Sequence, residues 1–326
     1  MKKNEPADDA LHFASVVTKA WTPEKLKKIT GGSRYKILPI NAPHLLRKLG
    51  LLNGDGSMSA DSVRKFSQIN HMLNLLEPAL ADIIKNIKTP VVVEAGCGKS
   101  YLSLVLMWAF DTIWNRPAYL VGIDTNPKVV EKSQATAEAL GWGARSTFLA
   151  ANLADDWWTT SRDAIAATIG LDPDKCRPNV VLALHACDTA TDHALAAGVN
   201  HNADLIACAP CCQAELAAKW RALGDGESSS LSPIYRSPEL RRDVAADITD
   251  MYRVLLLRSR GYEVTATEFV PSEHTPKNRL IRAVRRGRYL LSAQKEYADM
   301  RQTFGNVGIT LEGLLRSQET PPAEVR

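Results

Sequence analysis

The residues best suited to chemistry stand directly after short apolar runs of the chain. Glu94 ends one such run and is followed by two turn glycines, Gly96 and Gly98. Asp124 and Asn152 end the next two apolar runs. A glycine turn lets backbone amides approach a ligand closely, and the three polar side chains can add hydrogen bonds to it. These residues predict a small-molecule site.

Two common nucleotide sites do not fit this turn. The segment Gly98–Ser100 resembles the end of a phosphate-binding P-loop, but that motif needs a glycine where this chain has Val93. A dinucleotide site needs a third glycine where this chain has Tyr101. An acid followed by Gly-x-Gly remains, which is typical of S-adenosylmethionine (SAM) sites.

We therefore expect SAM as the cofactor. Glu94 would help to hold its amino group, and the amides around Gly96 and Gly98 would face its carboxylate. Asp124 would accept both ribose hydroxyls, and Asn152 would meet the adenine edge. A glycine turn in an unrelated α/β protein is the alternative interpretation.

A second group of reactive residues follows the fourth and fifth apolar runs. His185 and Asp188 follow the fourth run, and Cys211 and Cys212 follow the fifth. Ligands of parallel sheets bind outside the carboxyl ends of strands, so both segments should face one crevice. His185 and Asp188 are candidates for deprotonating or orienting a methyl acceptor, although His185 also fits a structural role. We expect the thiols of Cys211 and Cys212 to shape the wall of the reaction pocket.

Cysteines near these strand ends also suggest zinc. Four of them lie close to His185 in the sequence: Cys187, Cys208, Cys211 and Cys212. Cys208 falls inside an expected buried strand, so the set should converge poorly, and we predict no metal. A zinc deaminase is disfavoured further, because Cys187 replaces the glutamate of His-x-Glu. A disulfide between neighbouring cysteines is possible in principle but is disfavoured in a reducing compartment.

The elements that must position these residues alternate between strand and helix. Strands are expected at residues 90–94, 119–124, 147–152, 180–185, 205–209, 262–270 and 280–284. Helices are expected at 101–110, at 127–140 and from Pro238 to about Gly261. This order predicts an α/β, Rossmann-like class I methyltransferase fold. Its seven-stranded, mostly parallel sheet would end in a C-terminal antiparallel hairpin, after a mainly helical N-terminal region.

We expect three parts along the chain. Residues 1–60 form a basic, mainly helical region, and residues 61–290 form the SAM-dependent methyltransferase domain. Residues 291–326 form a helical extension and a flexible tail. A polar insertion at 222–237 could serve as a lid over a small acceptor.

Charge is distributed unevenly. Residues 19–48 contain eight bases and one acid, and residues 277–301 contain eight bases and two acids. These segments carry +7 and +6, so the rest of the chain carries −9 of the total +4. This pattern is expected if the ends bind a polyanion such as RNA, and two solvated faces are the alternative.

Composition narrows the class of protein. The 326 residues are 45% hydrophobic, yet no apolar run approaches the ~18 residues of a membrane span. The first residues lack the apolar core of a secretory signal, and six cysteines in a chain of this size need not form a disulfide framework. We expect a cytoplasmic protein without a membrane association or an obligate protein partner.

Longer motifs resemble a known family. His-Ala-Cys-Asp-Thr-Ala-Thr-Asp at 185–192 and Ala-Pro-Cys-Cys-Gln at 209–213 resemble a bacterial class I SAM-dependent methyltransferase family. The same domain is similar to eukaryotic tRNA 2′-O-methyltransferases that act near the acceptor stem. It is also similar to the glutathione S-transferase C-terminal domain-containing protein. The likeness covers about residues 60–286 and includes segments 65–70, 96–102 and 273–278.

The segments of this likeness contain further candidate site residues. Lys65, Gln68 and Asn70 lie on an expected helix before the first strand and would line the cofactor entrance, and an ordinary amphipathic helix is the alternative. Substrate contacts would come from Asp192, Gln213, Lys277 and Asn278. The tRNA enzymes tend to carry Cys-Cys-His where this chain has Cys-Cys-Gln, and this chain lacks their N-terminal zinc module.

The acceptor therefore stays open at this point. RNA methylation on a ribose hydroxyl or a base is the first hypothesis. A small-molecule or protein methyltransferase and a SAM-binding module without catalysis are the alternatives.

Overall fold

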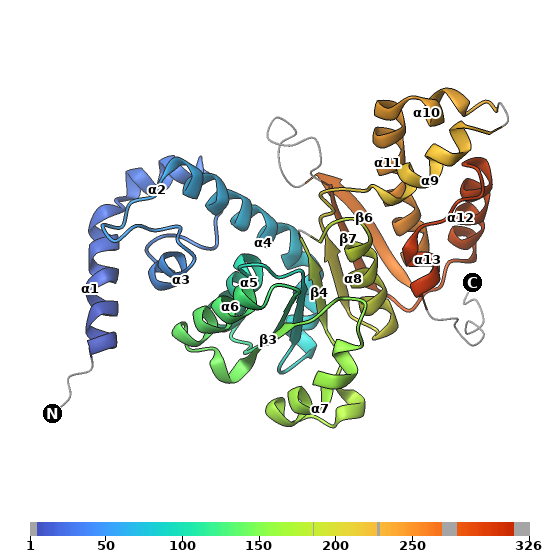
Figure 1. Cartoon of the computed structure of the whole chain (residues 1–326). Coiled ribbons are helices and arrows are strands. Elements are labelled where there is room, and N and C mark those ends of the chain that lie inside the picture. Colours follow the sequence, from blue (N-terminus) through green and yellow to red (C-terminus); the bar gives the residue numbers. More distant parts are fainter. Residues whose placement is uncertain (1–4, 185, 227–228, 269–278, 316–326) are drawn as a thin grey trace.

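A seven-stranded sheet forms the centre of the molecule (Figure 1). The computed structural model describes residues 5–184, 186–226, 229–268 and 279–315. The strand order is β3-β2-β1-β4-β5-β7-β6. The strands are β1 (Val91–Ala95), β2 (Tyr119–Asp124), β3 (Ser146–Ala150), β4 (Val180–Ala183), β5 (Leu205–Cys208), β6 (Tyr262–Glu268) and β7 (Arg279–Arg285). The first five run parallel, and β7 runs antiparallel to both β5 and β6.

The inner strands are buried because both faces of the sheet are covered. All five residues of β1 are buried, as expected for a parallel strand between two layers. Val91 and Val93 point into one hydrophobic cluster, while Val92 points into the other. The sheet therefore separates two cores.

Helices follow most of the strands and supply both layers. They are α5 (Tyr101–Thr112), α6 (Pro127–Ala139), α7 (Trp157–Ile169), α8 (Thr189–Asn200), α9 (Glu215–Gly224), α10 (Ser232–Arg236), α11 (Pro238–Ser259), α12 (Leu291–Thr303) and α13 (Thr310–Leu314). The core with Val92 contains residues of α5 and α6, and the other core contains residues of α7, α8 and α11. Short 3-10 turns at Gly143–Arg145 and Pro173–Lys175 complete the described helices.

The N-terminal region is helical, as predicted. It consists of α1 (Glu5–Ala20), α2 (Pro23–Thr30), α3 (Pro43–Lys48) and α4 (Ala60–Asn86). Asn70 is buried, which corrects its expected place at the cofactor entrance. Its side chain accepts from the amide of Ile37 and donates to the carbonyl oxygens of Ile37 and Phe66, and so ties the region together. Helices α1–α3 lie at one end of the molecule and α9–α13 at the other (Figure 1).

The fold prediction is confirmed, with small shifts in the strand bounds. The third strand ends at Ala150, so Asn152 stands two residues beyond it. The expected fourth strand reaches only Ala183. The expected tail and the loop between β6 and β7 lie outside the described residues, and the three-part division remains a prediction.

The expected insertion at 222–237 is mostly packed. It contains the end of α9 and all of α10. Trp220 of α9 contacts Tyr235 at 5.3 Å between ring centroids and stacks on Phe304 at 5.4 Å. These contacts pack Tyr235 against the neighbouring helices, and the role of the insertion as a lid stays a prediction. Of the helices in the described ranges, none combines the length and apolar character that crossing a membrane requires.

Candidate active site

The glycine turn after β1 has the backbone that its sequence predicts. Gly96 and Gly98 have φ angles of 66° and 49°, in the left-handed region that favours glycine. The amide of Cys97 donates to the carbonyl oxygen of Ile123 at 2.8 Å, which joins the turn to β2. A Cβ atom on Gly96 would lie 3.6 Å from the Cβ of Ala186, so the turn packs against the loop after β4.

Glu94 lies buried at the start of this turn. Its carboxylate accepts a hydrogen bond from the hydroxyl of Ser103 on α5, a partner that the sequence reasoning did not identify. Burial raises the pKa of Glu94 to about 7, because the low-dielectric interior disfavours the charged form; the hydrogen bond from Ser103 opposes this shift. Glu94 is thus poised to change charge near neutral pH.

Asp124 lies beside the same turn, at the end of β2. Its Oδ2 atom accepts from the amide of Gly98 at 2.9 Å, and its Oδ1 atom accepts from the amide of Asn126 at 2.9 Å. Two strand ends are thereby joined by one carboxylate. Asn152 is exposed after β3, and its side-chain oxygen accepts from the amide of Ala154 at 3.0 Å.

Lys65 and Gln68 are exposed on α4. The ammonium group of Lys65 pairs with Asp61 at 2.9 Å. Buried Phe66 lies between them in the sequence and belongs to the same core as Leu102 of α5. The role of Lys65 and Gln68 at a cofactor entrance stays a prediction.

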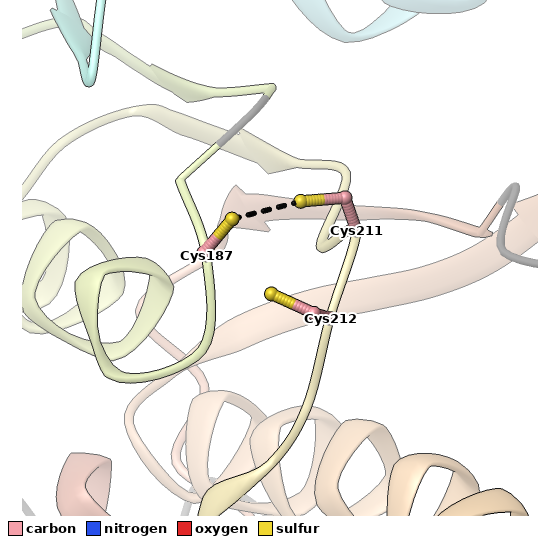
Figure 2. A group of neighbouring side chains, drawn as sticks. All are labelled: Cys187, Cys211 and Cys212. Atoms are coloured by element: carbon pink, nitrogen blue, oxygen red, sulfur yellow. Dashed lines mark hydrogen bonds between the residues drawn. The ribbon is translucent and has the colours of Figure 1, made fainter.

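Three thiols come together at the ends of β4 and β5. The sulfur atoms of Cys187, Cys211 and Cys212 all lie within 4.8 Å of one another. The sulfurs of Cys187 and Cys211 are 3.1 Å apart, and all three point into the space between two loops (Figure 2). Cys208 is fully buried inside β5 as expected, and burial raises its pKa to about 12.

Asp188 holds the two cysteine loops together, and its expected role in deprotonating or orienting an acceptor stays a prediction. Its amide donates to the carbonyl oxygen of Cys212 at 3.1 Å. Its Oδ1 atom accepts from the amides of Ala214 and Glu215, at 3.0 and 3.2 Å, where α9 begins. The φ angle of Asp188 is 49°, so the loop turns sharply here. We conclude that Asp188 positions the loops.

Asp192 and Gln213 lie beneath these loops, and their expected contact with a substrate is corrected. Asp192 has no exposed surface; its carboxylate accepts from Nε of Arg253 at 2.7 Å and from the amide of Leu311 at 3.0 Å. Gln213 is buried and donates from Nε2 to both carboxylate oxygens of Asp250, each at 3.2 Å. Both side chains support the loops from inside the protein.

Arg253, like Ser103, is a residue that the sequence reasoning missed. It stands fully buried in α11, pairs with Asp192 and Asp250, and donates from Nη2 to the carbonyl oxygen of Asp188 at 2.9 Å. An arginine directly before the apolar run Val254–Leu257 was the available signal, because a charge on a buried helix face needs a partner.

Three predicted site residues, His185, Lys277 and Asn278, lie outside the described residues. Their roles remain predictions.

The two basic segments differ in how their charges are used. In residues 19–48 seven of the eight bases are exposed, and Lys36 is half-buried against Glu77. In residues 277–301 three arginines are held in ion pairs with acids of this chain: Arg279 with Asp247 and Asp250, Arg286 with Asp82 and Glu263, and Arg301 with Glu312. Of the bases of this segment that the structure describes, Arg285, Arg286, Arg288 and Lys295 are exposed. Both segments therefore present charge to solvent, and the binding of a polyanion by either stays a prediction.

Comparison with known proteins agrees with this site. Residues 64–219 match the family model of a methyltransferase domain. No curated protein matches the chain in sequence.

Solved structures give further likenesses. Magnesium protoporphyrin IX methyltransferase from Synechocystis PCC 6803 with bound SAM is 18% identical with a TM-score of 0.39, over 74% of this chain and 90% of that one. A Podospora anserina methyltransferase bound to S-adenosylhomocysteine (SAH) is 13% identical with a TM-score of 0.38, over 88% and 98%. TrmK of M. capricolum in complex with SAH is 11% identical with a TM-score of 0.34, over 64% and 67%.

The matched domain contains β1 to β5, and with them the glycine turn, Glu94 and Asp124. It also contains the loops that carry the three thiols. The matched family model, together with the sheet order, identifies residues 64–219 as a methyltransferase domain.

Proposed function

We propose that this chain is a cytoplasmic methyltransferase that transfers the methyl group of SAM to RNA, on a ribose hydroxyl or a base. Bound SAM supplies an electrophilic methyl group. Glu94 holds its amino group, and the amide of Gly96 faces its carboxylate. The amide of Gly98, expected to do the same, donates instead to Asp124, which binds the ribose of SAM. The acceptor approaches over the loops after β4 and β5. In-line placement of donor and acceptor then lowers the barrier through proximity and orientation.

The observation that carries the RNA proposal is the exposed charge of residues 19–48. Helix α2 presents Lys25, Lys27 and Lys28 to solvent within eight residues, against the single acid Glu24. Such a surface attracts a polyanion, and each phosphate it neutralises releases a counterion. The N-terminal region therefore provides the main RNA contact in this proposal.

A cavity of about 450 Å³ lies elsewhere, between α9, α10 and α11. Its lining includes Arg221, Arg236 and Arg241 and comes from these helices and the residues beside them rather than from the glycine turn. We do not assign it to the methyl acceptor.

The proposal is tested by incubating the full chain with methyl-labelled SAM and separate pools of RNA, protein and metabolites. Label is expected in RNA, and Asp124→Ala should abolish it. Label that appears only in metabolites or only in protein refutes the RNA acceptor and supports the corresponding alternative.

A second measurement isolates the basic surface. The triple variant K25A/K27A/K28A should bind RNA more weakly and reduce the slope of log affinity against log salt by about 2, since each phosphate contact contributes about 0.7 to 0.9. The control is K128A/K132A, which removes two exposed lysines from α6. Equal salt slopes for the two variants would contradict the N-terminal RNA contact.

A further inference from the structure

Three cysteine side chains from two separate loops converge at the carboxyl ends of β4 and β5. We propose that Cys187, Cys211 and Cys212 form a metal site that binds one zinc ion. Zinc prefers thiolate sulfur and accepts three protein ligands with a fourth position open to water or substrate. Cys187 precedes the adjacent pair Cys211 and Cys212 by 24 and 25 positions, so it is the fold that brings Cys187 to them.

The sulfur positions suit such an ion. Zn–S bonds of about 2.3 Å place the sulfurs of a tetrahedral site about 3.8 Å apart. The Cys187–Cys211 separation is 3.1 Å, and no pair of the three exceeds 4.8 Å. Small side-chain rotations bring these distances to the required value. Cys187 and Cys211 are exposed, so an ion reaches the site from solvent.

The backbone around the thiols is held in place by contacts that do not involve the sulfurs. Asp188 joins the loop of Cys187 to the loop of Cys212 and to the first turn of α9. Arg253 fixes the carbonyl oxygen of Asp188 from beneath. Gln213, next to Cys212, is anchored on Asp250, which also pairs with Arg253. A site held in this way loses little conformational entropy when the metal binds.

The position of the site gives it a chemical use. Ala186, directly before Cys187, packs against Gly96 of the glycine turn. A metal ion held here would lie at the edge where the methyl acceptor arrives, and its fourth position would take an acceptor oxygen, nitrogen or sulfur. A bound zinc ion lowers the pKa of such a ligand. This use rests on the proposed function, whereas zinc binding itself does not.

The binding step is a ligand exchange without electron transfer. Each thiol releases its proton to solvent as its sulfur binds, and the metal loses water molecules. The competing process is a disulfide between Cys187 and Cys211, which would need an oxidant and would remove two of the three ligands.

The test uses the full-length protein purified under reducing conditions. We expect one zinc ion per chain after loading with Zn²⁺ and removal of the excess. Replacement by Co²⁺ should give the intense sulfur-to-cobalt absorption of a thiolate site. Cys187→Ser, Cys211→Ser and Cys212→Ser should each weaken zinc binding at least tenfold. Cys176→Ser is the matched control, because Cys176 is buried after α7 and should leave zinc binding unchanged.

A measurement on the unchanged chain guards against variants that fail to fold. Zinc should protect the three thiols from alkylation, as mapped by mass spectrometry, while chelation should expose them. Substoichiometric zinc, equal alkylation with and without Zn²⁺, or a Cys187–Cys211 disulfide under reducing conditions would overturn the site. Zinc binding without RNA methylation would leave the site intact and refute only the proposed function.

Discussion

Glu94 provides a sharp test of how the cofactor is bound. Its carboxylate is buried beside the glycine turn, and burial raises its pKa to about 7 from 4.5. If Glu94 pairs with the amino group of SAM, it must be ionised in the complex. Below pH 7 a proton must therefore leave before binding, and affinity should fall as the pH falls.

The size of this effect follows from the pKa. For a site that binds only when ionised, the apparent Kd varies as one plus the ratio of protonated to ionised Glu94. With a pKa of about 7, the Kd should be about fivefold higher at pH 6 than at pH 7 and approach a tenfold change per unit at lower pH. Glu94→Gln should bind more weakly and lose this pH dependence.

Isothermal titration calorimetry with SAH between pH 5.5 and 7.5 measures the effect without turnover. The control is Glu131→Gln, because Glu131 is exposed on α6 and should not alter the profile. A wild-type affinity that does not change with pH, or a Glu94→Gln variant with the wild-type profile, would refute the reasoning.

The same shift has a consequence for stability. Because the folded-state pKa is raised, the unliganded protein should lose stability as the pH rises from 4.5 through about 7. The loss at pH 8 is on the order of 3 kcal/mol. Glu94→Gln should lack this loss and unfold at a higher temperature than the wild type at pH 8. Thermal unfolding of both proteins at pH 5 and pH 8 measures the difference, and equal pH dependence would contradict it.

Three further substitutions test the packing. Arg253→Ala should lower the free energy of unfolding by about 3 to 5 kcal/mol, because it leaves the carboxylates of Asp192 and Asp250 buried without their shared partner; a loss under 1 kcal/mol in urea would contradict that burial. Asn70→Ala should cost about 2 to 4 kcal/mol in the same assay, since the backbone groups it satisfies stay buried; an unchanged midpoint would argue against the contact. Gly122→Ala should lower the melting temperature by several degrees, because its Cβ would lie 2.3 Å from the ring of Phe148; an unaltered melting curve would count against this register.

The cofactor side of the site was predictable because its signals are local. Buried apolar runs that end in Glu94 and Asp124 indicate strand ends, and strand ends of a parallel sheet meet at one edge. Gly96 and Gly98 predicted the turn because they are local signals too: glycine readily adopts the positive φ angles found there. Ser103 was missed, because its contact with Glu94 depends on how α5 packs on the sheet.

The acceptor side was less predictable because its contacts join distant residues. Asp192 and Arg253 are 61 positions apart and meet because α8 and α11 contribute to the same core. Their pairing turns Asp192 from an expected substrate contact into internal support. Cys187 lies beside Cys211 and Cys212, and the next residue, Asp188, has a positive φ angle; sequence spacing reveals neither feature.

The net charge of a segment did not show which of its charges stay exposed on the folded protein. The count for residues 277–301 could not show that Arg286 faces Asp82 of α4, some 200 positions away. Such pairs need tertiary structure to be seen. The same holds in residues 19–48, where Lys36 pairs with Glu77 and Arg47 with Asp9.

The sheet acts as a partition between two separately packed halves of the enzyme. On one side Phe13 and Ile37 of the N-terminal region share a core with Cys97 of the glycine turn. On the other side Ala186, in the loop after β4, and Cys208, at the end of β5, share a core with α11. Substitutions that destabilise the N-terminal region should therefore weaken cofactor affinity first. Substitutions that destabilise α11 should first slow methyl transfer to the acceptor. The enzyme could therefore lose one capability by mutation while retaining the other.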